Sequence, residues 1–157
     1  SENEFTASVD MPIFKETIYK DFDVGSKTLN LPVIKIPGIY HIIISQNLEK
    51  SLAEKLIKMW CNKLNADALG LMFFDEQRAF LKPLVYVKAV DTLYWESSCA
   101  SGTAALGFYI SKKYESKVSL NISEEGGTLT VDAAPSGKVR LTGNVRFIGN
   151  KEFIFNE

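Results

Sequence analysis

One cysteine stands where the sequence predicts the start of a helix. Residues 83–95 are rich in β-branched and aromatic side chains, which favours a strand, and a small polar turn that holds Cys99 follows. A helix is expected from about 102 to 114. The first N–H groups of a helix lack intrahelical partners and carry partial positive charge, which lowers the pKa of a nearby thiol. Cys99 is therefore a candidate thiolate base.

The helix after Cys99 is apolar or small on every face. No charged residue occurs between Thr103 and Ile110, and Lys112 and Lys113 follow at the C-terminal end, where cations suit the helix dipole. Such a helix must be enclosed by the rest of the domain. The alternative is that Cys99 is only a small buried cap residue, because free cysteine is among the most buried residue types.

The composition indicates a single domain over residues 1–157. With 18 basic and 19 acidic residues the net charge is −1, which disfavours nucleic acid or an anionic membrane as a partner. No apolar run is long enough to span a bilayer, so we expect a cytoplasmic protein.

Cys61, Cys99 and the single histidine, His41, lack metal-ligand spacing, and no metal is expected. Cys61 is interpreted as a packing residue. Because the chain starts with Ser1 and enters a strand almost at once, we expect a fragment of a longer protein.

Alternation and helical periodicity place the other elements. Strands are expected at 5–9, 33–36, 39–44, 68–74 and 79–95, and an amphipathic outer helix is expected to begin after residues 45–47. Alternating runs at about 118–122, 129–131, 139–147 and 153–155 form an antiparallel meander. Residues 13–31 are interpreted as irregular, with room for one short strand. A meander with one apolar face can curl around the enclosed helix. The predicted class is α+β, with a mixed, mainly antiparallel sheet rolled around one central apolar helix.

The run Cys99-Ala100-Ser101-Gly102-Thr103 resembles a motif of a known enzyme family. It is similar to the second catalytic-cysteine motif, Cys-Gly-(Ser/Thr)-Gly-(Thr/Ala), of the diaminopimelate epimerase-like racemases and epimerases, with Ala100 as the one departure. The longer run 83–107 is similar to the branch that racemises histidine for metallophore synthesis. The resemblance implies an enzyme without a cofactor that acts on an amino acid as its small-molecule substrate. It also implies two halves, each a sheet rolled about a helix.

The resemblance also implies roles for the motif residues. Cys99 would be one of two acid/base thiols on opposite faces of the substrate. The backbone amides of Ala100, Ser101, Gly102 and Thr103 would bind the substrate carboxylate.

Three further residues follow from looser matches. His41 ends the run 38–41, where the family has Gly-Asn-Pro-His, and would polarise the cysteines; the alternative is a core histidine. Glu96 matches the acid upstream of the motif and would tune the thiol or bind the substrate ammonium; the alternative is a strand-end charge. Asp67 falls roughly where the family reads the distal group of its substrate.

The motif comparison assigns the chain to the C-terminal half of such an enzyme. The Cys-Gly-Asn-Gly run of the N-terminal half is absent, and Cys61 is followed by Asn62 rather than glycine. We therefore expect an N-terminal half as partner and no racemisation by this chain alone, and a homodimer stays open.

Departures from the family pattern bear on the substrate. Ile39 and Ser97 replace residues that hold the distal carboxylate of diaminopimelate, which favours a neutral or basic amino acid such as histidine. Two alternatives remain: an isomerase domain like those of phenazine biosynthesis, and a non-catalytic module that binds small anions or a partner.

Overall fold

The computed structural model describes residues 4–152. The helices are α1 Lys50–Lys63, α2 Ala100–Lys113 and the short 3-10 helix η1 Lys88–Val90. The strands are β1 Glu4–Asp10, β2 Thr17–Val24, β3 Lys27–Ile36, β4 Ile39–Ile44, β5 Ala68–Asp75, β6 Phe80–Val87, β7 Thr92–Trp95, β8 Val118–Glu124, β9 Gly127–Ala133 and β10 Val139–Arg146. The predicted strand at 153–155 lies outside the described residues. Within residues 4–152, neither long helix is sufficiently long and apolar to cross a membrane.

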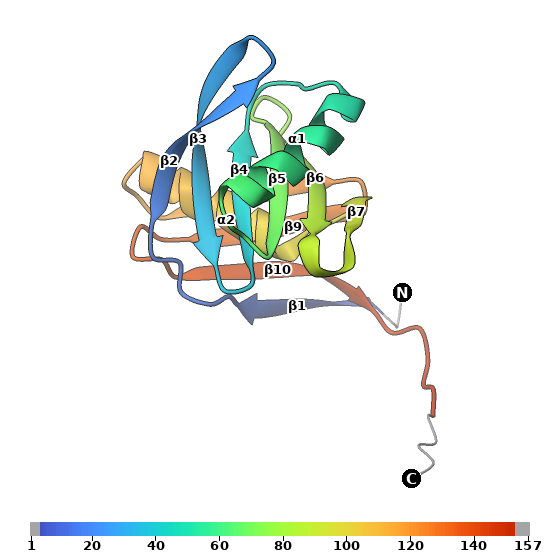
Figure 1. The fold of residues 1–157 in the computed structure, drawn as a ribbon. Coiled ribbons are helices and arrows are strands. Elements are labelled where there is room, and N and C mark those ends of the chain that lie inside the picture. Colours follow the sequence, from blue (N-terminus) through green and yellow to red (C-terminus); the bar gives the residue numbers. More distant parts are fainter. Residues whose placement is uncertain (1–3, 153–157) are drawn as a thin grey trace.

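The strands form one sheet in the order β1-β10-β9-β8-β6-β5-β4-β3-β2, with β7 paired to β6. The β4–β5 and β6–β8 pairs are parallel and the others are antiparallel. This confirms the predicted α+β class with a mixed, mainly antiparallel sheet. Only one residue pair, Phe80 with Ser123, joins β6 to β8. In Figure 1 the strands β8 to β10 accordingly run across the direction of β3 to β6.

Helix α2 is largely buried, as its composition predicted. Eight of its residues are buried, from Gly102 to Phe108 together with Ser111. It packs against β3, β4 and β5 and also against β8, β9 and β10 (Figure 1). Gly107 permits close approach to β9, because a Cβ there would lie 2.4 Å from a methyl group of Val131. The tight packing fixes the position of the helix N-terminus.

Helix α1 lies on the other face of the sheet and packs mainly against β5 and β6. Its buried residues are Ala53, Leu56, Ile57, Trp60 and Cys61, and this confirms the predicted amphipathic helix and the packing position of Cys61. Alternate residues of β4 and β5 pack toward α2 or toward α1, so both strands are buried on both faces, as is typical of strands with continuous apolar sequence.

The prediction that residues 13–31 are irregular apart from one short strand was wrong. They contain β2 and most of β3, which form a hairpin around Gly25 at a φ of 61°. Phe22 is fully buried in this hairpin, with its ring 4.7 Å from that of Trp60. Pro32 lies within β3 rather than before a strand. The β3–β4 ladder begins at Val33, so the missing N–H of Pro32 interrupts no ladder bond on that side.

Candidate active site

Cys99 occupies the N-cap position of helix α2. Its backbone is extended, with φ −134° and ψ 99°, and its carbonyl accepts a 2.8 Å hydrogen bond from the N–H of Thr103. Helix α2 thus begins at Ala100, slightly earlier than the sequence indicated. The predicted placement of a thiol at the positive end of a buried helix is confirmed.

A buried carboxylate that the sequence analysis did not single out supports this helix end. Glu124, the last residue of β8, is 5% exposed. One of its oxygens accepts a 2.8 Å hydrogen bond from the Cys99 N–H, and the other accepts a 2.6 Å bond from the Thr103 hydroxyl. Burial raises the pKa of Glu124, while these donors oppose the change. Glu124 therefore fixes the backbone of Cys99 against β8.

The expected lowering of the Cys99 pKa is not observed. The side chain is only 7% exposed, and burial raises the pKa of the Cys99 thiol to about 11. The Gly102 N–H and the Ser101 hydroxyl lower this pKa, but the loss of solvent outweighs them, and the nearby Glu96 carboxylate raises it further. In this structure Cys99 is a protonated thiol at neutral pH rather than a thiolate.

His41 lies beside Cys99 through a serine. The Nε2 atom of His41 is 3.0 Å from the Ser101 hydroxyl oxygen, which is 3.7 Å from the Cys99 sulfur. His41 is fully buried, and burial lowers its pKa to about 4. Its Nδ1 atom has no hydrogen-bond partner among the described residues. The predicted proximity of His41 to the thiol is therefore observed, with Ser101 between them.

Two glycines leave room for this cluster. A Cβ on Gly70 would lie 2.4 Å from His41 Nδ1, and a Cβ on Gly102 would lie 2.1 Å from the Met72 sulfur and 3.2 Å from that of Cys99. Ala100, where the family motif has glycine, is exposed. The departure from the motif thus falls at a position where a methyl group faces solvent.

The helix-end amides are not all available to a ligand. The Thr103 N–H bonds to the Cys99 carbonyl, and the Gly102 N–H points to the Cys99 sulfur. Thr103 and Gly102 are also buried, so their predicted contact with substrate does not match the geometry. Among the described residues, the amides of Ala100 and Ser101 keep no backbone acceptor, because the first N–H groups of a helix have none.

Of the other two predicted site residues, Glu96 lies near Cys99 and Asp67 does not. Glu96 is half-buried between β7 and α2 and is close enough to Cys99 to raise its pKa. Asp67 is exposed before β5, in a depression of about 420 Å³ lined also by Lys35 and Tyr40. Burial, and to a smaller extent Asp67, raises the pKa of Cys61. Asp67 is therefore associated with the other cysteine and not with Cys99.

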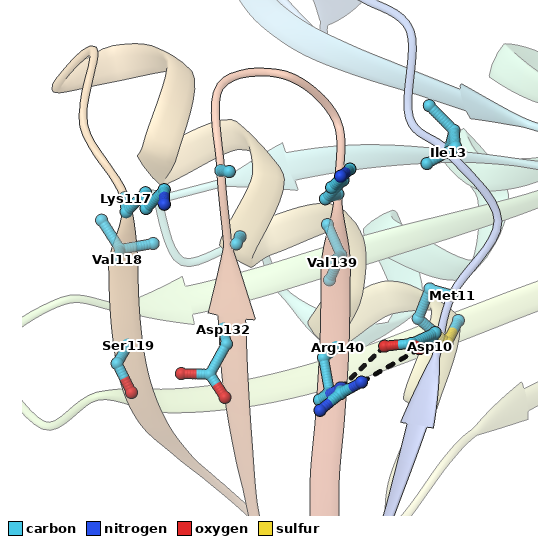
Figure 2. A pocket seen from close by; sticks show the side chains of 12 residues that line it. Asp10, Met11, Ile13, Lys117, Val118, Ser119, Asp132, Val139 and Arg140 are labelled. Atoms are coloured by element: carbon cyan, nitrogen blue, oxygen red, sulfur yellow. Dashed lines mark hydrogen bonds and ion pairs between the residues drawn. The ribbon is translucent and has the colours of Figure 1, made fainter.

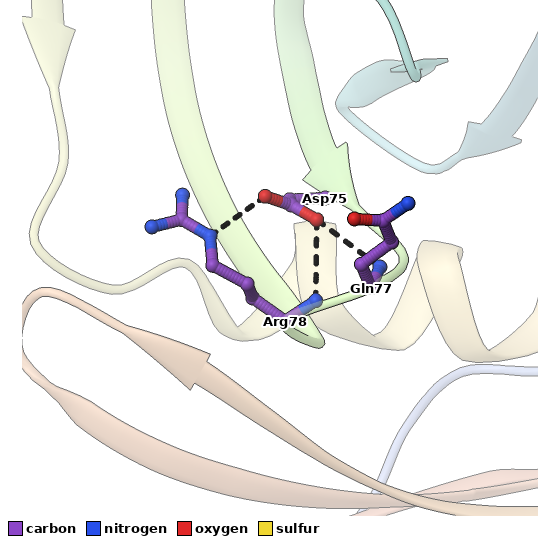
Figure 3. A network of polar contacts seen from close by, with 3 residues as sticks. All are labelled: Asp75, Gln77 and Arg78. Atoms are coloured by element: carbon purple, nitrogen blue, oxygen red, sulfur yellow. Dashed lines mark hydrogen bonds and ion pairs between the residues drawn. The ribbon is translucent and has the colours of Figure 1, made fainter.

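Two larger depressions lie elsewhere on the surface of residues 4–152, and neither is lined by Cys99. Figure 2 shows the one of about 800 Å³ at β8 to β10, where Arg140 Nε donates to Asp10 at 2.7 Å. The other, of about 570 Å³, lies beside the β5–β6 turn and Trp95. In that turn Asp75 accepts bonds from the N–H groups of Gln77 and Arg78 and from the Arg78 side chain (Figure 3). Its carboxylate is thus already engaged.

A solved structure shares the fold. The chain is similar to a phenazine biosynthesis PhzC/PhzF protein from Clostridium difficile, with a TM-score of 0.50 and 12% sequence identity, over 98% of this chain and 60% of that one. At this identity the likeness concerns the fold alone.

The family itself is defined by sequence. The histidine racemase CntK N-terminal domain family matches residues 1–150, and the chain belongs to this family. It is 34% identical over 136 residues to a histidine racemase of Fusobacterium nucleatum subsp. nucleatum (strain ATCC 23726), covering 82% of this chain and 49% of that protein. It is 36% identical over 130 residues to a histidine racemase of Staphylococcus aureus (strain Mu50), covering 78% and 47%.

The chain therefore spans about half the length of the curated relatives it matches. The family description places the matched region in an N-terminal domain. This description disagrees with the C-terminal half that the cysteine motif had indicated, and we do not retain that assignment.

Proposed function

We propose that this chain is one half, the N-terminal one, of a cofactor-independent histidine racemase, with Cys99 as one of its two proton-exchanging thiols. The observation that carries the proposal is the Cys99 thiol at the N-terminus of α2, in hydrogen-bond reach of Ser101. The relatives named histidine racemase support the substrate. The fold proposed with it is a sheet rolled around α2, and the proposed location is the cytoplasm.

The raised pKa of Cys99 suggests its role in the cycle. A base on the other half removes the α-proton of the amino acid, which leaves a planar carbanion. The Cys99 S–H bond then breaks, its proton forms a new C–H bond on the opposite face, and Cys99 becomes a thiolate. The Gly102 N–H and the Ser101 hydroxyl stabilise that thiolate until the reverse reaction or solvent restores the proton.

The amides at the start of α2 suit the substrate carboxylate. Ala100 is exposed and Ser101 is half-buried, so their N–H groups are nearer to solvent than those of Gly102 and Thr103. Unpaired N–H groups at a helix N-terminus bind anions and favour negative charge. The same groups stabilise the charge that spreads toward the carboxylate in the carbanion.

A second half is proposed because the chain spans about half the length of the histidine racemases it matches, and Cys99 lines none of the described depressions. An exposed apolar surface lies at the same end of the sheet. We call the exposed side chains Phe5, Val9, Val145 and Phe147 the β1–β10 patch. Phe5 pairs with Val145, and Val9 pairs with Leu141, a buried residue that packs in the cluster around α2. The patch thus continues the face of the sheet that α2 covers.

The strand register also places the patch at the same height along the strands as Glu124, which binds Cys99. Glu124, which binds the Cys99 N–H, pairs with Gly127. Continuing the β9–β10 register places Val145 opposite Gly127, with Phe5 next to it. With strands about 4.8 Å apart, Phe5 lies roughly 14 Å from Glu124 across the sheet. A second domain that covers the patch would close over the start of α2 and complete the site.

The alternative function is a non-catalytic module that binds small anions. The low exposure and high pKa of Cys99 favour this alternative for the chain by itself. An isomerase like those of phenazine biosynthesis is supported by the fold alone. Racemisation assays separate these alternatives from the proposed function.

The test uses the full-length protein that carries this chain. Replacing Cys99→Ser should reduce histidine racemisation about 10²- to 10⁴-fold, the usual contribution of an acid–base group. The matched control is Cys61→Ser, since Cys61 packs between α1 and the sheet. Equal activity of the two variants would refute the proposal. The 157-residue chain alone should show no turnover.

A further inference from the structure

The polar groups around Cys99 form a directed chain through one side chain. His41 on β4, Ser101 in the first turn of α2 and the Cys99 sulfur follow one another at 3.0 and 3.7 Å. The His41 ring is 0% exposed, so no solvent competes for Nε2. Among the described residues, the Ser101 hydroxyl is the only group that contacts both the His41 ring and the Cys99 sulfur.

The buried Nδ1 atom determines the direction of the chain. Nδ1 has no partner among the described residues. A buried N–H without an acceptor is rarer in proteins than an acceptor lone pair without a donor. The proton of the neutral ring therefore belongs on Nε2, where it donates to the Ser101 oxygen. The Ser101 hydroxyl proton is then left to point at the Cys99 sulfur.

We propose that Ser101 is a positioning residue whose hydroxyl, oriented by His41, stabilises the thiolate form of Cys99. This inference rests on the proposed function, because a thiolate forms there after the proton leaves Cys99. His41 contributes through Ser101 and has no direct contact with the sulfur among the described bonds. The side chain of Ser101 thus has a role separate from that of its backbone amide.

None of the other ionisable groups near the sulfur stabilises the thiolate. Glu96, after β7, raises the pKa of Cys99 by its charge and by a side-chain hydrogen bond. Glu124, on β8, bonds to the Cys99 N–H and not to the sulfur. His41, on β4, stays neutral above about pH 4 and brings no positive charge. Because no cation faces the sulfur from these elements, a neutral donor such as the Ser101 hydroxyl is needed for the thiolate.

The first test measures Cys99 alkylation by iodoacetamide from pH 7 to 10, followed by mass spectrometry of the Cys99 peptide. Ser101→Ala should slow the reaction about tenfold at a given pH, because the loss of one hydrogen bond to the thiolate raises the pKa of Cys99 by about one unit. Ser101→Thr, which keeps a hydroxyl, should restore most of the rate. Ser97→Ala, an exposed serine two residues before Cys99, is the matched control.

The second test uses the single histidine of the chain. In protein labelled with ¹⁵N-histidine, the His41 ring should give the signals of a neutral Nε2–H tautomer at pH 7, and Ser101→Ala should shift the Nε2 signal. An unchanged alkylation profile in Ser101→Ala, or an Nδ1–H tautomer, would overturn the inference. Neither measurement requires racemase activity, so failure here and failure of the proposed function are separate results.

Discussion

The Glu124 carboxylate accepts the backbone N–H of Cys99 at 2.8 Å, although the two residues are 25 positions apart in the chain. The same carboxylate binds the Thr103 hydroxyl, so one acid joins the end of β8 to the first turn of α2. Both donors are buried, and so is the acid. The position of the candidate thiol therefore depends on a residue from a different part of the sheet.

Replacing Glu124→Gln should destabilise the fold by about 1–3 kcal/mol, because the amide offers one acceptor where the carboxylate satisfied two buried donors. Urea denaturation measures the change in the free energy of unfolding. The matched control is Glu125→Gln, at the next residue. Glu125 is exposed, and its ion pair with Lys82 is long at 3.9 Å. If both variants lose the same stability, Glu124 has no special structural role.

Stability should fall as the pH is lowered from about 6.5 to about 4. Burial lowers the pKa of His41 to about 4 from its ordinary value of 6.5, so the unfolded chain binds more protons in this range. The neutral His41 side chain therefore contributes about 3 kcal/mol to the free energy of unfolding. This contribution is fully present above pH 6.5 and is lost as the pH falls toward 4. Denaturation at several pH values should show a shallower dependence in His41→Gln. The same slope in both proteins would mean that His41 is not held neutral.

Gly70 should tolerate no side chain while His41 is present. A Cβ there would lie 2.4 Å from the imidazole and 2.7 Å from the Met72 methyl group, so Gly70→Ala should cost about 1–3 kcal/mol through overpacking. Thermal or urea denaturation checks this. In a double-mutant cycle with His41→Ala, the cost of Gly70→Ala should become smaller. An additive result would show that the imidazole does not set the restriction.

Cys99 should react slowly with alkylating reagents at pH 7 in the 157-residue chain. Burial raises its pKa to about 11, and burial also raises that of Cys61, which donates to the Ala66 carbonyl. The Cys99 rate should therefore keep rising up to pH 10. Rapid modification of Cys99 alone at neutral pH would show that the thiol is more exposed and more acidic than this structure indicates.

The sequence predicted the elements whose periodicity is strong. The amphipathic α1, the apolar α2 and the meander of β8 to β10 all follow from apolar spacing. The β2–β3 hairpin was missed because Lys20 interrupts the inward face between Ile18 and Phe22, and Tyr19 lies on the outer face. Tertiary packing against Trp60 gives that hairpin its apolar face.

The site was predictable in part. The sequence correctly placed Cys99 at the start of α2, but no local pattern reports how deeply a thiol is buried, and burial decided its pKa. Glu124 had a signal that was not used. It continues the inward positions Val118, Leu120 and Ile122 of β8, so an acid there faces the core and needs donors.

The most direct measurement is α-proton exchange of L- and D-histidine in D₂O by full-length Cys99→Ser protein. If Cys99 serves one face of the substrate, inversion should be lost from both enantiomers. Exchange without inversion should persist only for the enantiomer whose α-proton faces the other half. Inversion by the Cys99→Ser protein at the rate of the protein that keeps Cys99, or equal exchange of both enantiomers, would contradict a proton-transferring role for Cys99.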